Sequence, residues 1–278
     1  MVIQWYPGHI AKAEKELQTQ LKRVDVVIEV RDARIPRASA HPQIPQWVEG
    51  KLHLVVVNRM DAIDLHLRQK WQAYYQQQGQ EIFFANARSG EGVRPILAMT
   101  KTSATAVNQR RQSRGMLQRP ARAVVVGFPN VGKSALINRL LNRKVCESAN
   151  RPGVTRQLRW IRISDVVELL DTPGVIPPLL QNQETAVKLA ICDDIGTASY
   201  DPVLVAARAI ELWQEVGLNL ADRYGLDYVN TGNDRGMVYL AELAEKLHQG
   251  DKLKTALKLL HDYRSGKLGT IGLEVPPS

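Results

Sequence analysis

The sequence predicts an α/β fold in which a P-loop domain, residues 1–178, precedes a smaller all-α C-terminal domain, residues 179–278. Two patterns support this division. Before Pro178, short apolar runs that end in glycine or polar residues alternate with helical patterns, as in a domain with a mainly parallel sheet. After Pro178, apolar residues recur at helical spacing, which is typical of helices packed on one another.

The predicted elements follow in chain order. Strands are expected at Val24–Val30, Leu54–Asn58, Ile82–Ala85, Ala123–Val126, Leu158–Ile163 and Val166–Leu170. Helices of the first domain are expected at Lys12–Leu21, Val93–Asn108 and Ser134–Leu141, with a basic connector over residues 109–120. Helices of the second domain are expected at Val203–Trp213, Met237–His248 and Lys252–His261, where the apolar stripes would form core.

One loop carries the strongest chemical signal. Residues 127–134 read Gly-Phe-Pro-Asn-Val-Gly-Lys-Ser between a predicted strand and a predicted helix, which is the context that a phosphate-binding loop requires. Lys133 would bridge the β- and γ-phosphates, and the Ser134 hydroxyl would bind Mg²⁺. The residues expected to contact the nucleotide here are Asn130, Val131, Gly132, Lys133, Ser134 and Ala135.

Two later segments complete the expected phosphate and metal site. Asp171-Thr-Pro-Gly174 follows an apolar run, so Asp171 would hold Mg²⁺ through water and the Gly174 N–H would reach the γ-phosphate. Thr155, in Pro-Gly-Val-Thr, would complete the metal shell only when the γ-phosphate is present. The predicted metal ligands are therefore Ser134, Thr155 and Asp171.

A guanine reader is expected upstream of the phosphate loop. Residues 58–61 read Asn-Arg-Met-Asp after an apolar strand, close to the Asn-Lys-x-Asp pattern in which the Asp accepts from two donors of guanine. Asn58, Arg59 and Asp61 are the expected base contacts, with the flat Arg59 guanidinium stacked on the base in place of the usual lysine. Asn86 and Ala87, in a looser match to Ser-Ala-Lys, would support the guanine oxygen through their backbone.

The order of these motifs predicts a circularly permuted GTPase, in which the base reader precedes the phosphate loop. Permutation preserves such a site because ligand loops gather at the carboxyl ends of parallel strands, wherever the chain enters the sheet. The expected cofactors are GTP or GDP and Mg²⁺. The segment after Asp171 would lead directly into the C-terminal domain, so switch movement would pull on that domain.

Together with Trp5-Tyr-Pro-Gly-His-Ile-Ala-Lys-Ala13 at the start, these motifs resemble the ribosome biogenesis GTPase A family, the circularly permuted YlqF/RbgA type. The resemblance covers nearly the whole chain, including Arg223–Leu226 and Lys267–Gly269. It implies a protein that binds the precursor of the large ribosomal subunit and its rRNA in the GTP state, hydrolyses GTP, and is then released.

The resemblance also points to two residues with roles in hydrolysis. Many GTPases orient the attacking water with a Gln after Asp-x-x-Gly, but this chain has Val175 there, so hydrolysis should be slow without another group. His9 of Pro-Gly-His is the implied catalytic substitute, and its alternative is a histidine that caps the following helix. Asn130 would hold K⁺, as in potassium-stimulated relatives, or would serve loop geometry alone.

The sequence argues against a membrane-spanning protein and against a secreted one. No apolar run approaches the roughly 18 residues that a membrane span needs, and the N-terminus has no cleavable signal pattern, so we expect a cytoplasmic monomer. Cys146 and Cys192 lack metal-ligand spacing and are expected to be reduced thiols.

Charge points to an RNA partner, and no DNA partner is expected. Residues 1–178 carry 27 Lys and Arg against 14 Asp and Glu, whereas residues 179–278 carry 10 against 14. No acidic residue lies between Glu91 and Glu147, a density of positive charge that suits a phosphate backbone. In the acidic C-terminal domain, a local basic face is expected at Lys252, Lys254, Lys258 and Arg264.

Two other functions agree with the same sequence. The chain could be a permuted GTPase that serves another RNA target, such as the small subunit. It could also be a nucleotide-gated RNA-binding module without catalysis, because Val175 removes the usual catalytic group.

Overall fold

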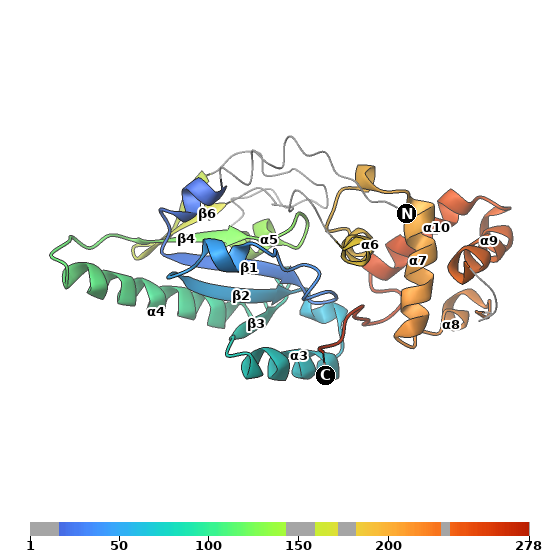
Figure 1. The fold of residues 1–278 in the computed structure, drawn as a ribbon, viewed down its shortest axis with the longest axis horizontal. Coiled ribbons are helices and arrows are strands. Elements are labelled where there is room, and N and C mark those ends of the chain that lie inside the picture. The colour runs from blue at the N-terminus through green and yellow to red at the C-terminus, as the bar shows by residue number, and fades with distance from the viewer. Residues whose placement is uncertain (1–16, 143–158, 172–181, 229–233, 278) are drawn as a thin grey trace.

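A six-stranded sheet forms the centre of the first part of the molecule (Figure 1). The structure is a computed structural model, and it describes residues 17–142, 159–171, 182–228 and 234–277. The strands are β1 (Val26–Asp32), β2 (Leu52–Asn58), β3 (Ile82–Ala85), β4 (Ala121–Val126), β5 (Arg159–Ser164) and β6 (Val167–Asp171). Their order across the sheet is β3-β2-β1-β4-β6-β5. Only β5 runs antiparallel to its neighbour, so the other five strands end at one edge.

The order of the strands creates a topological switch point at that edge. The chain lays β1, β2 and β3 side by side in one direction and then returns to place β4 on the other side of β1. Loops that leave neighbouring strands toward opposite faces of a sheet diverge at such a switch point, and ligands bind there. The loop after β4 is the predicted phosphate loop, so it lies where the topology favours a ligand.

Helices cover both faces of the sheet. On one face, α4 (Val93–Gln112) and α5 (Lys133–Leu140) share a core cluster with β1, β2 and β4. On the other face, the helical residues 17–21 and the short α2 (Ile44–Trp47) pack on β1, β4 and β6. There α3 (Leu65–Gln77) packs on β2 and β3, and the short helix η1 (Met60–Ala62) precedes it. The first part is therefore a three-layer α/β structure.

The C-terminal part is entirely helical among its described residues. Its elements are α6 (Gln183–Cys192), η2 (Thr197–Ser199), α7 (Pro202–Glu215), α8 (Ala221–Tyr224), α9 (Arg235–His248) and α10 (Lys252–Arg264). Helix α7 lies at the centre of this group and contacts α6, α9 and α10. Its Trp213 is fully buried, with its ring 5.3 Å from that of Tyr263 in α10.

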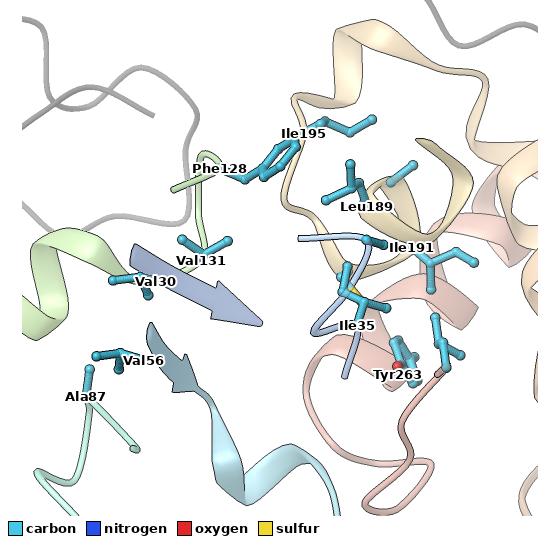
Figure 2. Packing of buried hydrophobic residues seen from close by; sticks show 14 of the residues in the cluster. Val30, Ile35, Val56, Ala87, Phe128, Val131, Leu189, Ile191, Ile195 and Tyr263 are labelled. Carbon is cyan, nitrogen blue, oxygen red and sulfur yellow. The ribbon is translucent and has the colours of Figure 1, made fainter. Parts of the chain in front are cut away.

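Both parts contribute to one continuous core. Figure 2 shows Phe128 of the phosphate loop pointing toward Ile195, which follows α6, and Ile35 after β1 near Tyr263 of α10. All four side chains are buried. Apolar contact therefore holds the helical part against the carboxyl edge of the sheet, close to the predicted nucleotide loops.

The last described residues return to the sheet. Leu273 N–H donates to the Arg34 carbonyl at 2.8 Å, and the Glu274 carboxylate accepts from the N–H groups of Arg37 and Ala38. A side chain at Gly272 would approach Leu67 of α3 closely. We call residues 271–274 the C-terminal strap, because their hydrogen bonds hold the segment that follows β1.

The predicted fold class is confirmed, while several element bounds differ. Strand β1 runs to Asp32 rather than Val30, because its parallel pairing with β2 continues to the pair Asp32 and Asn58. Helix α4 continues four residues past Asn108, to Gln112, through a basic stretch that the prediction had placed in a connector. The domain boundary at residue 178 stays a prediction, since residues 172–181 lie outside the described part.

Candidate nucleotide-binding site

The predicted phosphate loop joins β4 directly to α5. Two of its glycines adopt positive φ, 146° at Gly127 and 100° at Gly132. A side chain at Gly127 would collide with the Val30 carbonyl, and one at Gly132 would collide with the Asn58 amide. Glycine is therefore required at both positions, by backbone conformation and by the close approach of neighbouring strands.

The lysine and serine of the loop occupy the start of α5. Lys133 is buried, and its Nζ donates to the Phe128 carbonyl at 2.7 Å, so the ammonium group is curled back over the loop. Ser134 follows in the first turn of α5, and the N-terminus of a helix favours an anion. This arrangement fits the phosphate groups of a nucleotide.

Two of the predicted magnesium ligands, Ser134 and Asp171, belong to elements that meet at this end of the sheet. Strand β6 is parallel to β4 and ends at Asp171, paired with Val125 just before the loop. The backbone thus brings the predicted carboxylate ligand to the strand beside the predicted hydroxyl ligand, Ser134. Hydroxyl and carboxylate oxygens are ligands that Mg²⁺ prefers. Their roles as metal ligands stay predictions.

Asn58 links three parts of the site. Its Nδ2 donates to the Val131 carbonyl in the phosphate loop at 2.8 Å, and its Oδ1 accepts from Ala87 N–H at 3.0 Å. Both ends of one buried amide are therefore used to fix the distance between the base reader, the phosphate loop and the loop after β3. Asn58 holds the loops together through its side chain.

Arg59 holds its neighbours in a way that the sequence did not predict. Its backbone is left-handed, with φ of 61°, and its guanidinium donates to Asp32 Oδ2 at 3.0 Å and to the Asn130 carbonyl at 2.5 Å. A weaker bond reaches the Cys192 carbonyl at 3.4 Å. The guanidinium therefore braces the loops, and stacking of this side chain on a base stays a prediction.

The base-contacting positions lie at the same edge. Asp61, in η1, is exposed and lies two residues after Arg59. Asn86 caps its own loop, since its Oδ1 accepts from the N–H groups of Arg88 and Ser89. Arg139 of α5 donates to the carbonyls of Ala87 and Arg88, which ties that loop to the phosphate-loop helix.

Asn130 faces the helical part. Its Nδ2 donates to the Asp193 carbonyl at 2.7 Å, and its φ of 57° is left-handed. This bond makes Asn130 a direct contact between the phosphate loop and the end of α6. The K⁺ site at its amide oxygen stays a prediction.

Three predicted site residues lie outside the described part of the chain: His9, Thr155 and Gly174. Among the described predicted residues, Asn58, Arg59, Asn130 and Val131 are joined by hydrogen bonds, and Gly132 lies against Asn58. Ala135 follows in the first turn of α5.

The sequence did not predict the group of side chains that donates hydrogen bonds to the carbonyls at the end of α6. Arg264 donates to the carbonyls of Ala190 and Ile191. Arg34 and Arg59 donate to the carbonyl of Cys192, and Asn130 donates to the carbonyl of Asp193. These are the last carbonyls of a helix, which lack the usual partner four residues on, although Ala190 also accepts from the Asp193 N–H at 3.1 Å. The signal that could have found this group is the pair of charged residues, Asp32 and Arg34, immediately after a strand that ends at the ligand edge.

The predicted basic face of the helical part is wrong in part, because Arg264 turns inward to α6. Lys258 is also engaged, at 3.1 Å from the buried carboxylate of Asp262. Burial raises the pKa of Asp262, but bonds from Lys258, Arg223 and Tyr224 outweigh it and lower the pKa to about 2. Only Lys252 and Lys254 of the four predicted residues remain exposed without an ion pair in the described part.

Unlike Asp262, the carboxyl of Asp194 lies in an environment that raises its pKa. Asp194 is fully buried, and neither of its oxygens has a hydrogen-bond partner in the described part of the chain. Burial raises the pKa of Asp194 well above its usual value, and the negative charge of Asp32 raises it further. The side chain thus favours the neutral acid beside a strongly charged network.

Comparison with known proteins finds related GTPases. Residues 122–232 match the family described as 50S ribosome-binding GTPase. Ribosome biogenesis GTPase A of Bacillus cereus is 35% identical over 286 residues, covering 99% of this chain and 95% of the relative. Mitochondrial ribosome-associated GTPase 1 of mouse is 38% identical, covering 98% of this chain and 90% of the relative.

A solved structure shares the fold. The crystal structure of GNP-bound YlqF from Thermotoga maritima superposes with a TM-score of 0.65 at 22% identity, covering 96% of this chain and 99% of that one. No helix among the described residues is long and apolar enough to cross a membrane.

Asp61 should decide the choice of base. Asp61→Asn removes the carboxylate that two donors of guanine require, so affinity for GTP should fall by at least about a hundredfold, the loss of two charge-assisted hydrogen bonds. Affinity for xanthosine triphosphate should rise, since its extra carbonyl suits an amide donor. Titration with both nucleotides measures this. Asp64→Asn, three residues on in the cap of α3, is the matched control and should leave affinity unchanged; intact GTP binding in Asp61→Asn would reject the assignment.

Asp194 should make stability depend on pH. Its folded pKa lies above the unfolded value, so folding takes up a proton, and the wild-type protein loses stability as pH rises from about 4 through the folded pKa. Asp194→Asn removes this dependence and should gain roughly 1–3 kcal/mol relative to wild type at pH 8, with no gain near pH 4. Thermal unfolding across this range tests it.

Asp262→Asn provides the contrasting control. The pKa of Asp262 is lowered to about 2, so its stabilisation is present above the unfolded value and is lost as pH falls. This variant should therefore be less stable than wild type at pH 8. A gain for Asp194→Asn that does not change with pH would mean that repacking, not the proton, is responsible.

Proposed function

The chain belongs to the family of ribosome biogenesis GTPase A, as its motifs predicted, and from this premise we propose that it is an assembly factor of the large ribosomal subunit. It is a P-loop GTPase of circularly permuted order that binds guanine nucleotide and hydrolyses GTP. In the proposed cycle it binds the precursor subunit and its rRNA in the GTP state, in the cytoplasm and as a monomer, and leaves after hydrolysis. The likeness of the whole chain to proteins named for ribosome biogenesis carries this proposal.

The contacts of α6 supply a physical basis for the cycle. The helix begins at Gln183, soon after the Asp171-Thr-Pro-Gly174 segment, and ends at Cys192 against Arg59 and the phosphate loop. A change at the γ-phosphate can therefore act on α6 from both ends. Since α6 packs on α7, such a change would reorient the helical part, which would alter contacts with a particle.

The metal and catalytic roles belong to the same proposal. Ser134, Thr155 and Asp171 hold Mg²⁺, and Asn130 holds K⁺ through its amide oxygen. His9 orients the attacking water when the particle is bound, in place of the Gln that Val175 replaces.

The exposed basic residues of α4 suit the RNA contact. Arg94, Lys101 and Arg110 are exposed, as is Arg114 just past the end of the helix, and none of the four has an acidic partner among the described residues. The far end of α4 extends past the sheet, at the opposite end of the molecule from α9 (Figure 1). Leu117 in the following turn is 87% exposed. A protruding helix with unpaired positive charge can approach a phosphate backbone without rearrangement.

Subunit-stimulated hydrolysis tests the function. The protein alone should turn over GTP slowly, and immature large subunits should stimulate it strongly whereas small subunits should not. His9→Ala should abolish most of the stimulation with little change in the dissociation constant for GTP, because the imidazole acts on the transition state. His66→Ala, at an exposed position on α3, is the control. Stimulation by small subunits alone would support the other RNA target, and no hydrolysis under any condition would support the non-catalytic module.

Charge reversal on α4 tests the RNA surface. Lys101→Glu with Arg110→Glu should weaken binding to large-subunit precursors by at least about tenfold and reduce the dependence of log affinity on log salt by roughly one to two. Lys252→Glu with Lys254→Glu changes the net charge equally on α10 and should have much less effect. Cosedimentation with a nonhydrolysable GTP analogue over a salt series provides the measurement. Equal losses in both variants would mean that net charge, not the α4 surface, determines binding.

A further inference from the structure

Asp32 lies at the end of β1 and belongs to none of the nucleotide motifs, yet four hydrogen bonds converge on its side chain. It is fully buried. Its Oδ1 accepts from the N–H and Nε of Arg34, both at 2.9 Å, and its Oδ2 accepts from Arg34 Nη2 at 2.8 Å and Arg59 Nη1 at 3.0 Å. Burial raises the pKa of Asp32, but the charges of Arg34 and Arg59 outweigh it and hold the pKa below its usual value. The carboxylate is therefore a fixed negative charge behind the base reader.

The link to the base reader runs through Arg59. This residue stands where a lysine is usual, between Asn58 and Asp61, and its side chain is 29% exposed. One end of its guanidinium bonds to Asp32, and the other bonds to the Asn130 carbonyl at 2.5 Å. A lysine ammonium is a compact charge on a flexible stem that can turn toward one acceptor, whereas a planar guanidinium presents its donors in a rigid fork, so that a bond at each end holds it in one orientation. With arginine in place of lysine, the side chain needs a second hydrogen-bond acceptor, and Asp32 supplies it.

The position of Arg59 also determines the position of Asp61. Arg59 has left-handed backbone conformation and immediately precedes the turn η1, which contains Asp61. A guanidinium fixed at both ends fixes the start of that turn relative to the phosphate loop. The distance between the groups that read the base and those that hold the phosphates then depends on Asp32.

We propose that Asp32 is a positioning residue for guanine recognition, which acts through Arg59 to hold the Asp61 turn against the phosphate loop. The alternative role is purely structural: the bidentate pair with Arg34 would only anchor the end of α6 through the Cys192 carbonyl. The two roles differ in what they predict for base selectivity and for its dependence on Arg59.

A double-mutant cycle separates the two roles. Asp32→Asn should lower affinity for GDP by about tenfold, the effect of one charge-assisted hydrogen bond. It should also reduce the preference for GDP over inosine diphosphate, which lacks the exocyclic amine that Asp61 accepts from. In an Arg59→Lys background the same substitution should cost no more than about twofold, because the ammonium reaches the Asn130 carbonyl without Asp32. Affinities come from competition with a fluorescent guanine nucleotide.

Asp25→Asn is the matched control. Asp25 also forms a bidentate pair, with Arg119, but at the opposite end of β1. Its loss should leave nucleotide affinity and base preference unchanged. An equal loss from Asp32→Asn in both backgrounds, or a loss of affinity with unchanged base preference, would show that Asp32 acts only through Arg34 and overturn the proposal.

A second variant keeps the test decisive if Asp32→Asn does not fold. Arg59→Gln leaves the Asp32–Arg34 pair intact and alters a partly exposed side chain. It should lower both GDP affinity and the preference over inosine diphosphate, while Arg59→Lys retains them. Unchanged binding by Arg59→Gln would overturn the proposal. None of these measurements involves a ribosome, so the result is independent of the assembly function.

Discussion

The carbonyl groups at the end of α6 impose the constraint on which much of the structure depends. A helix leaves its last carbonyls without internal partners, and here they are buried between the sheet and the helical part. Arg34, Arg59 and Arg264, together with Asn130, supply the missing donors. Hydrogen bonds from charged donors contribute about 1.5–3 kcal/mol each, and the positive charges also suit the negative end of the helix dipole. Since the donors come from four separate segments, one helix end joins the base reader, the phosphate loop and α10.

Circular permutation is tolerated because the site is assembled across strands and not along the chain. Asn58 spans from β2 to the phosphate loop, and Gly132 leaves the space that its amide needs. Each of these contacts depends on strands lying side by side with their carboxyl ends together, an arrangement that is independent of where the chain begins. Permutation does change the segment that follows β6, which here leads into α6 and the helical part.

Features with a local pattern could be predicted from sequence, and those that depend on distant partners could not. The strand before Gly127 and the helix after Gly132 follow from apolar spacing and from glycine geometry. The roles of Asp194 and Arg264 left no such pattern, since burial and a partner some 70 residues away decide them. Arg264 was therefore assigned to a basic surface although it caps a helix. Asp32 was visible as a charged residue at a strand end, but its link to Arg59 required the register of β1 against β2.

The C-terminal strap has a consequence for folding during translation. Translation releases β1 and the Arg34 loop first, and residues 271–274, which fasten that loop, emerge more than 200 residues later. The nascent chain can pair its parallel strands before then, yet the segment that carries Arg34 lacks these hydrogen bonds until residues 271–274 have been made. Chains that stop before residue 271 would therefore leave this segment less firmly held and more open to proteases.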